Sequence, residues 1–163
     1  MSMLISLIYW TLFAYGIFST SAVSFQASSI CGINYYQNQK ILKICENVFK
    51  ILGTGHTERV YHNALLIELQ NAKIPHRSEV MCPYFYKGKC VGYGTADVVL
   101  YNTVLELKVG TAEPDIHATQ LKKYVHSLRE NEKTLYDGLL VNFNQKTGKI
   151  HSSFYTYNNT KLT

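Results

Sequence analysis

The sequence predicts an α/β fold in which a mixed central sheet is flanked by helices. Apolar residues recur at helical spacing in three segments of the chain. Runs rich in β-branched and aromatic residues, separated by short turns, lie between the second and third of these segments and again after the third. The resulting order is helix, helix, antiparallel strands, helix, strand, strand, which is typical of helices packed on a mixed sheet.

Composition favours one folded domain over a disordered chain. The 163 residues are 47% hydrophobic and include 13 Tyr and 7 Phe, which is enough to build a core. Lys and Arg number 16 against 11 Asp and Glu, so the net charge is +5. This excess gives mild support for a polyanionic partner such as nucleic acid.

The N-terminal part differs from the rest of the chain because no charged side chain precedes Lys40. We therefore expect an apolar segment over residues 1–36, separate from a domain over residues 37–163. Its run Met3–Phe18 resembles a secretory signal peptide, with Thr20-Ser21-Ala22 as the cleavage tripeptide. A membrane contact through residues 3–25 and a packed or dispensable extension are the other interpretations.

The helices are expected over Gln37–Leu52, Thr57–Ala72 and Pro114–Arg129. Gly53-Thr54-Gly55 ends the first helix, and Ile74-Pro75 ends the second. On the first two helices, the side chains expected to face inward are Ile41, Ile44, Cys45, Val48, Phe49, Leu52, Val60, Tyr61, Ala64, Leu65 and Leu69.

Strands are expected at six places along the chain. They are Ser78–Tyr86, Lys89–Tyr93, Thr95–Tyr101, Thr103–Val109, Gly138–Phe143 and Lys149–Tyr157. A two-residue turn at Lys87-Gly88 would place Tyr86 opposite Lys89 and Phe85 opposite Cys90, which disfavours a disulfide between Cys82 and Cys90. We interpret Tyr84, Tyr86 and Tyr93 as strand packing, not as base-stacking platforms.

The most informative residues are Asp97, Glu106 and Lys108, which lie in two adjacent apolar strands. Charged groups in such a place are costly unless something compensates them. A divalent cation bridging the two carboxylates would do so, because Mg2+ prefers hard oxygen ligands. Glu106 and Lys108 are two residues apart and share a face, whereas Leu107 points into the core and leaves its carbonyl as a further ligand.

The helices add further candidate site residues. Glu58 stands at the start of the second helix, three residues before Tyr61 and on the same face. His117, Gln120 and Tyr124 form a polar strip along the third helix, where a Gln and a Tyr could position phosphate or water.

These motifs together resemble the GxxExxY family of the PD-(D/E)XK nuclease-like superfamily, over about Gln39–Phe143. The matching segments are Gly55-His56-Thr57-Glu58-Arg59-Val60-Tyr61, Tyr84-Phe85-Tyr86-Lys87-Gly88, Ala96-Asp97, Glu106-Leu107-Lys108, His117-Ala118-Thr119-Gln120-Leu121-Lys122-Lys123-Tyr124 and Gly138-Leu139-Leu140-Val141-Asn142-Phe143. Ala96 stands where the superfamily's name has Pro, and Thr95 where this branch often carries a basic residue.

The resemblance implies a restriction-endonuclease-like fold and assigns roles to the candidate residues. Glu58, Asp97 and Glu106 would lie near the metal, Lys108 would take the catalytic lysine position, and Gln120 and Tyr124 would be the helix motif. The expected function is a Mg2+- or Mn2+-dependent nuclease that hydrolyses phosphodiester bonds in DNA, acting inside the cell.

Two alternatives stay open at this point. One is a catalytically inactive nucleic-acid- or protein-binding module with the same fold. The other is an exported or membrane-anchored protein in which the carboxylates are structural.

Overall fold

The computed structural model describes residues 20–111 and 115–156 of the chain. The chain divides into two compact units, residues 1–36 and 37–163, and the second unit holds the whole sheet. The run Met3–Phe18, on which the signal-peptide and membrane interpretations depend, lies outside the described residues. Among the helices that the structure describes, none is long and apolar enough to cross a membrane.

The domain is built on a mixed five-stranded sheet with the order β1-β2-β3-β4-β5. The strands are β1 (His76–Tyr86), β2 (Lys89–Leu100), β3 (Thr103–Gly110), β4 (Asp137–Asn144) and β5 (Lys149–Tyr155). The β3–β4 pair is parallel and is joined by helix α4 (Asp115–Glu132), whereas the other neighbouring strands pair antiparallel. The structure therefore has the α/β architecture expected for a restriction-endonuclease-like fold.

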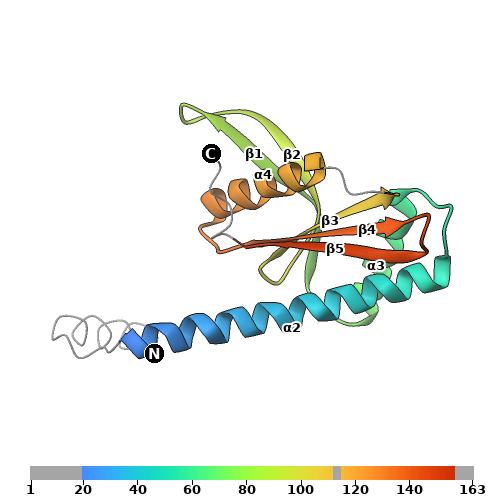
Figure 1. Ribbon diagram of the computed structural model, residues 1–163. Coiled ribbons are helices and arrows are strands. Elements are labelled where there is room, and N and C mark those ends of the chain that lie inside the picture. Colours follow the sequence, from blue (N-terminus) through green and yellow to red (C-terminus); the bar gives the residue numbers. More distant parts are fainter. Residues whose placement is uncertain (1–19, 112–114, 157–163) are drawn as a thin grey trace. The chain divides into compact units, whose positions relative to one another are not determined.

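Helices cover both faces of this sheet (Figure 1). Helix α3 (Glu58–Asn71) and the part of α2 (Thr20–Leu52) that lies in the domain pack on one face, through a core that includes Ile41, Phe49 and Leu65. Helix α4 packs on the other face through a second core that includes Leu121, Val125 and Leu128. Both cores are supplied by the apolar stripes that the sequence predicts for these helices.

Three details of the predicted elements are wrong. Helix α2 begins at Thr20, well before the predicted start at Gln37. Val60 is 38% exposed and does not face inward. The two strands predicted on either side of Gly94 are one strand, β2, because Gly94 stays in the ladder opposite Cys82.

Gly94 allows neighbouring side chains to pack closely and does not mark a break between two strands. A Cβ atom at Gly94 would lie 2.3 Å from side-chain atoms of both Tyr84 and Tyr124. A strand interior glycine often marks such a close approach of neighbouring groups.

The β1–β2 turn confirms the predicted register. Lys87 and Gly88 both have positive φ, as a two-residue type I′ turn requires, and Phe85 lies opposite Cys90. Cys82 and Cys90 are free thiols. Tyr84 is half-buried and packs on the α4 core, but Tyr86 and Tyr93 are exposed, so interpreting these two as strand packing is wrong.

Candidate functional site: a fork between two strands

The candidate site lies where β2 separates from β3. The ladder between these strands runs from Leu100 and Thr103 to Val98 and Leu105, where it ends. Asp97 is the next residue of β2, and its Oδ2 accepts the backbone N–H of Leu107 at 2.7 Å. A carboxylate thus takes over hydrogen bonding to β3 where the strands diverge. We call this place the fork.

Glu106 and Lys108 occupy the β3 side of the fork. The Lys108 ammonium lies 2.8 Å from Glu106 Oε1 and donates to the Leu107 carbonyl oxygen at 2.7 Å. The Glu106 side chain is only 1% exposed, and its Oε2 is buried with no hydrogen-bond partner in the part of the chain that the structure describes. An ionised carboxylate oxygen in that position is costly to keep unpaired.

Glu58 reaches the same ammonium from the first turn of α3. Its Oε1 lies 3.4 Å from Lys108 Nζ, and its side chain is 43% exposed. The structure therefore brings four of the predicted site residues, Glu58, Asp97, Glu106 and Lys108, into one electrostatic cluster.

The loop before α3 is tied to the carboxyl end of β4, and this sets where α3 begins. Gly55 donates its N–H to Gln145 Oε1 at 2.6 Å, and the Tyr61 hydroxyl donates to the Gly53 carbonyl at 2.7 Å. Gln145 also donates to the Phe143 carbonyl, which anchors it to β4. The spacing of glycine and tyrosine around Glu58 thus has a structural role: it fixes the loop that carries this carboxylate.

Electrostatics at the fork oppose full ionisation of both the buried Glu106 and the half-buried Asp97. Burial, and next the charge of Asp97, raise the pKa of Glu106 to about 7, although Lys108 acts in the other direction. Burial also raises the pKa of Asp97, against the hydrogen bond from Leu107 and the charge of Lys108. Burial alone would lower the pKa of Lys108, but its bond to Glu106 and the surrounding carboxylates raise it, so the ammonium stays protonated.

The donor set fits a divalent cation. The carboxylates of Glu58, Asp97 and Glu106 outnumber the single ammonium of Lys108, and Glu106 Oε2 lacks a partner. Carboxylate and carbonyl oxygens are the ligands that Mg2+ and Mn2+ prefer. Across residues 20–111 and 115–156, however, no group of three or more His, Cys, Asp or Glu side chains is already arranged to hold a metal ion.

Gln120 and Tyr124 form a separate pair on α4. Gln120 Nε2 donates to the Tyr124 hydroxyl at 2.6 Å, and Tyr124 is buried against β2 at Gly94. Burial, followed by the charges of Tyr124 and Cys82 and then that of Glu106, raises the pKa of Tyr84. Tyr84 and Tyr124 lie side by side over Gly94.

A family model described as the PD-(D/E)XK nuclease superfamily matches residues 36–152. The chain belongs to this superfamily. A solved structure, "Crystal structure of SSO0001", is similar over 60% of this chain at 22% identity with a TM-score of 0.45. The chain spans half the length of that structure. No curated protein matches the chain significantly.

Membership of the PD-(D/E)XK superfamily indicates a nuclease-like function. Nucleases of this superfamily act on nucleic acid and generally use divalent metals. The fork brings together two carboxylates and a lysine, which are groups that such chemistry requires.

Sequence reasoning missed His62, which also belongs to the PD-(D/E)XK domain's candidate site. Its Nε2 lies 3.2 Å from the Asp97 carbonyl oxygen and 3.3 Å from Ser78 Oγ. The spacing in the sequence could have identified His62, because it follows Glu58 by four residues and such residues share a helix face. Gln145 was also missed, and no local pattern in the sequence marks it.

Proposed function

We propose that residues 37–163 form a Mg2+- or Mn2+-dependent nuclease of the GxxExxY branch that hydrolyses phosphodiester bonds in DNA. One observation carries the proposal. Glu106 is a buried carboxylate beside Asp97, with one oxygen on Lys108 and the other unpaired. A structural acid would have its second oxygen satisfied, whereas a metal ligand needs it free.

Asp97 and Glu106 would hold the metal, with help from Glu58 and the Leu107 carbonyl. When bound, the cation would polarise the scissile phosphate and favour ionisation of a bound water. The two acids would orient the cation because their positions are fixed: Asp97 is held by the Leu107 N–H, and Glu106 by Lys108. The exposed position of Glu58 suits a ligand that moves when substrate arrives.

Lys108 acts as a charged donor in this proposal. Its raised pKa keeps the ammonium protonated, so it offsets negative charge at the phosphate and orients the attacking water by hydrogen bonding. Its bonds to Glu106 and to the Leu107 carbonyl fix the ammonium before substrate binds. Such preorganised charge is among the largest contributions to catalysis.

Gln120 and Tyr124 would position the substrate from α4. The Tyr124 hydroxyl accepts a hydrogen bond from Gln120, which leaves its own proton available to donate to a phosphate oxygen or water. Tyr124 is fixed by the α4 core and by the close approach at Gly94, and Gln120 is held by its hydrogen bond to Tyr124.

The test is cleavage of supercoiled plasmid and of single-stranded DNA by the full chain with Mg2+ or Mn2+. Asp97→Ala and Lys108→Ala should abolish cleavage, because each removes one part of the fork. Glu130→Gln, which removes an exposed carboxylate on α4, is the matched control and should cleave as the wild type does. Undiminished cleavage in both fork variants would disprove the assignment.

A second candidate function is a nucleic-acid-binding module without turnover. Two observations favour it: Lys108 already neutralises one oxygen of Glu106, and the described residues contain no ready-made group of three metal-holding side chains. Salt-sensitive DNA binding with no cleavage in Mg2+ or Mn2+ would identify this function.

A further inference from the structure

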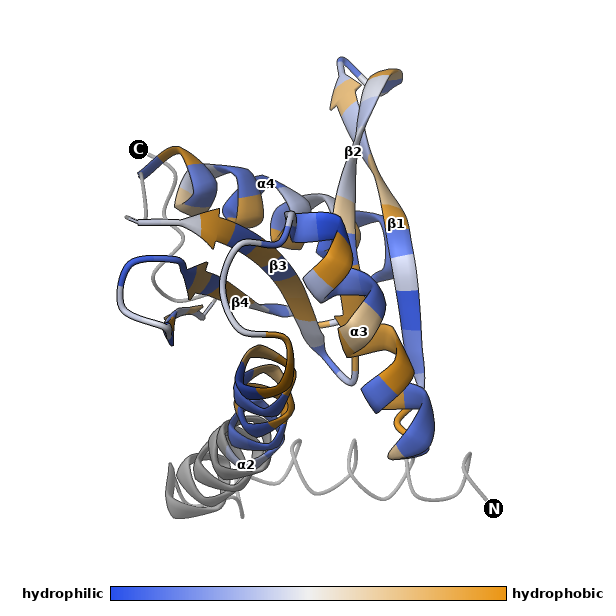
Figure 2. Cartoon of the chain, turned by 90° about the vertical axis from the view of Figure 1, so that its right-hand side faces the viewer, coloured by the Kyte–Doolittle hydropathy of each residue, from blue (hydrophilic) through white to orange (hydrophobic). Residues whose placement is uncertain are grey.

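The β1–β2 hairpin continues past the fork as a ribbon of only two strands, and we call its part Val80–Ala96 the ribbon. Among the strands that the structure describes, β2 pairs only with β1 from Ala96 to the hairpin tip. A strand rises about 3.3 Å per residue, so Lys89–Ala96 extends roughly 26 Å beyond Asp97. Figure 2 shows the ribbon extending away from the rest of the sheet and past α3 and α4.

Large apolar side chains on the ribbon are left in solvent. Those more than half exposed are Met81, Phe85, Tyr86, Val91 and Tyr93. An isolated two-stranded ribbon is only marginally stable in water, and gathered exposed apolar groups mark interaction sites. The ribbon therefore has the features of a surface that is covered when the protein works.

Three of these side chains, Met81, Phe85 and Tyr93, gather on one face because strand residues alternate. Cys82 and Tyr84 turn toward α4, where they join its core. Met81 and Phe85 alternate with them and so lie on the outer face, and Tyr93 joins that face because it pairs with Pro83. Aromatic rings thus lie along the face that α4 leaves uncovered.

The charge of the ribbon indicates the class of its partner. No acidic residue lies between Glu79 and Asp97, while Lys87 and Lys89 stand at the tip. The Lys87 ammonium lies 5.4 Å from the centre of the Tyr86 ring. Two copies of such a tip would repel each other, whereas a polyanion complements it.

We propose that the ribbon binds single-stranded nucleic acid and guides it to the fork. This inference rests on the proposed function, since the fork is the destination. Phe85 and Tyr93 stack on bases, and Lys87 and Lys89 contact phosphates. The strand is single because base faces in a duplex are covered by neighbouring pairs, and exposed rings then have nothing to stack on.

The test is fluorescence anisotropy of a labelled oligothymidylate of about 20 nucleotides, titrated with the full chain in EDTA so that no cleavage occurs. The double variant Phe85→Ser/Tyr93→Ser should bind about tenfold more weakly or worse, because each ring loses a stacking contact. Its matched control is Ile67→Ser/Leu135→Ser, which removes exposed apolar side chains outside the ribbon and should bind as the wild type does. Circular dichroism of every variant checks that the fold is retained.

A second variant tests the phosphate contacts. Lys87→Gln/Lys89→Gln should lower the steepness of log affinity against log salt by roughly 1.4, since each phosphate contact on a single strand contributes about 0.7. Both residues are exposed at the turn, so their replacement leaves the core intact.

Three results would overturn the ribbon proposal. The first is unchanged affinity of Phe85→Ser/Tyr93→Ser for the oligonucleotide. The second is tighter binding of a duplex of the same length than of the single strand. The third is a wild-type dimer, seen by sedimentation, that these substitutions dissociate without changing oligonucleotide affinity, because a second copy would then cover the ribbon.

The experiment separates the two proposals because binding is measured without metal. A chain that binds through the ribbon but never cleaves would keep the ribbon proposal and disprove the nuclease. If the chain cleaves DNA and the kcat and KM for single strands are unchanged in Phe85→Ser/Tyr93→Ser, the nuclease proposal is kept and the ribbon proposal is disproved.

Discussion

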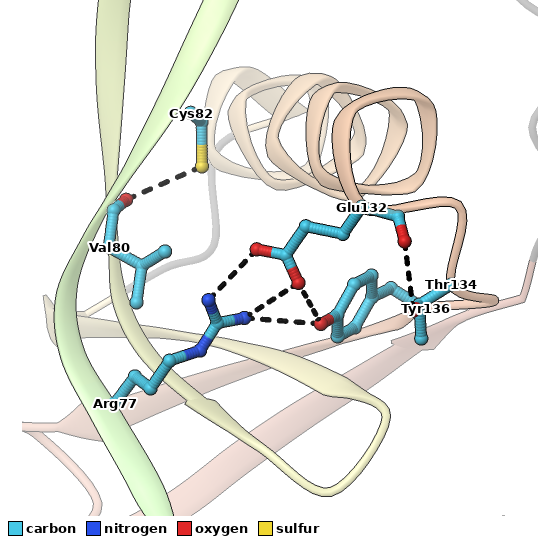
Figure 3. A network of polar contacts seen from close by, with 6 residues as sticks. All are labelled: Arg77, Val80, Cys82, Glu132, Thr134 and Tyr136. Carbon is cyan, nitrogen blue, oxygen red and sulfur yellow. Dashed lines mark hydrogen bonds and ion pairs between the residues drawn. The ribbon is translucent and has the colours of Figure 1, made fainter.

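Two charged clusters lie on β1–β3 and the elements around them, and they differ in how completely their charges are satisfied. Figure 3 shows the first, in which Arg77 of β1 meets Glu132 at the end of α4 and Tyr136 before β4. The guanidinium donates to both carboxylate oxygens, at 2.8 and 3.1 Å, and to the Tyr136 hydroxyl at 3.1 Å. Both carboxylate oxygens and the hydroxyl therefore have partners.

The second cluster is the fork, where charges and hydrogen-bond partners are not balanced. Its acids outnumber its ammonium, one oxygen of Glu106 has no hydrogen-bond partner, and burial raises the pKa of Asp97 and Glu106. In the first cluster, by contrast, the hydrogen bond from Arg77 lowers the pKa of Glu132. We infer from this difference that the paired cluster supports the fold, and we propose that the fork, with its residual negative charge, binds a cation.

The largest expected effect is on catalysis. Asp97→Asn should reduce Mg2+-dependent cleavage by at least about a thousandfold, because it removes a ligand charge while keeping the shape of the side chain. Arg77→Gln should leave the rate within about threefold of the wild type. Single-turnover cleavage of a labelled DNA measures both. A comparable loss of cleavage rate in the two variants would contradict the prediction that only the fork takes part in catalysis.

The next effect is on stability and depends on pH. The pKa of Glu106 rises from 4.5 in the unfolded chain to about 7 in the fold. The folded state thus binds the proton more tightly, so this stabilisation is complete below pH 4.5 and is lost as pH rises through 7. Glu106→Gln should therefore raise the free energy of unfolding at pH 8 in EDTA by roughly 1–3 kcal/mol.

Urea unfolding at pH 5 and pH 8 measures this change. Glu130→Gln, at an exposed position, is the control and should show no comparable gain. A Glu106→Gln protein that is less stable than the wild type at pH 8 would mean that the acid is structural and already satisfied.

The third effect is stabilisation by the metal itself. At tenfold excess over the dissociation constant, Mg2+ or Mn2+ should stabilise the wild type by about 1.4 kcal/mol, or about 4 °C in Tm. Asp97→Asn should lose this response, and Arg77→Gln should keep it. An equal metal-induced shift in the wild type and in Asp97→Asn would place the cation elsewhere.

Much of this arrangement follows from local sequence rules. The helix stripes, the Lys87-Gly88 turn and the alternation of Glu106, Leu107 and Lys108 each depend on residues a few positions apart. These rules also bring Asp97 and Glu106 together, because Asn102 lies in the turn that joins their strands. The roles of the site residues stay predictions until they are tested.

What the sequence could not give depends on contacts between distant segments. The sequence pattern predicts a break between two strands at Gly94, because nothing in the sequence shows that Tyr84 and Tyr124 close over it. Gln145 lies 90 residues from Gly55, which it binds. Exposure of Tyr93 follows from where the pairing of β2 with β3 ends, not from the propensity of tyrosine for strands.

The smallest expected effect concerns the satisfied cluster. Arg77→Gln should lower the free energy of unfolding by roughly 0.5–1 kcal/mol at pH 7, since the Arg77 side chain is 49% exposed and solvent screens the pair. The lowered pKa of Glu132 gives the sign of the pH dependence. This stabilisation is present above pH 4.5 and is lost as pH falls through the folded pKa, so the difference between wild type and variant should vanish in acid.

A double-mutant cycle with Glu132→Gln, followed by urea unfolding at pH 7 and pH 3, isolates the pair from its separate contacts. Coupling at pH 7 that disappears at pH 3 is the expected result. Coupling that persists at pH 3 would show that packing, not charge, joins β1 to α4. The cluster in Figure 3 would then no longer serve as the charged counterpart of the fork.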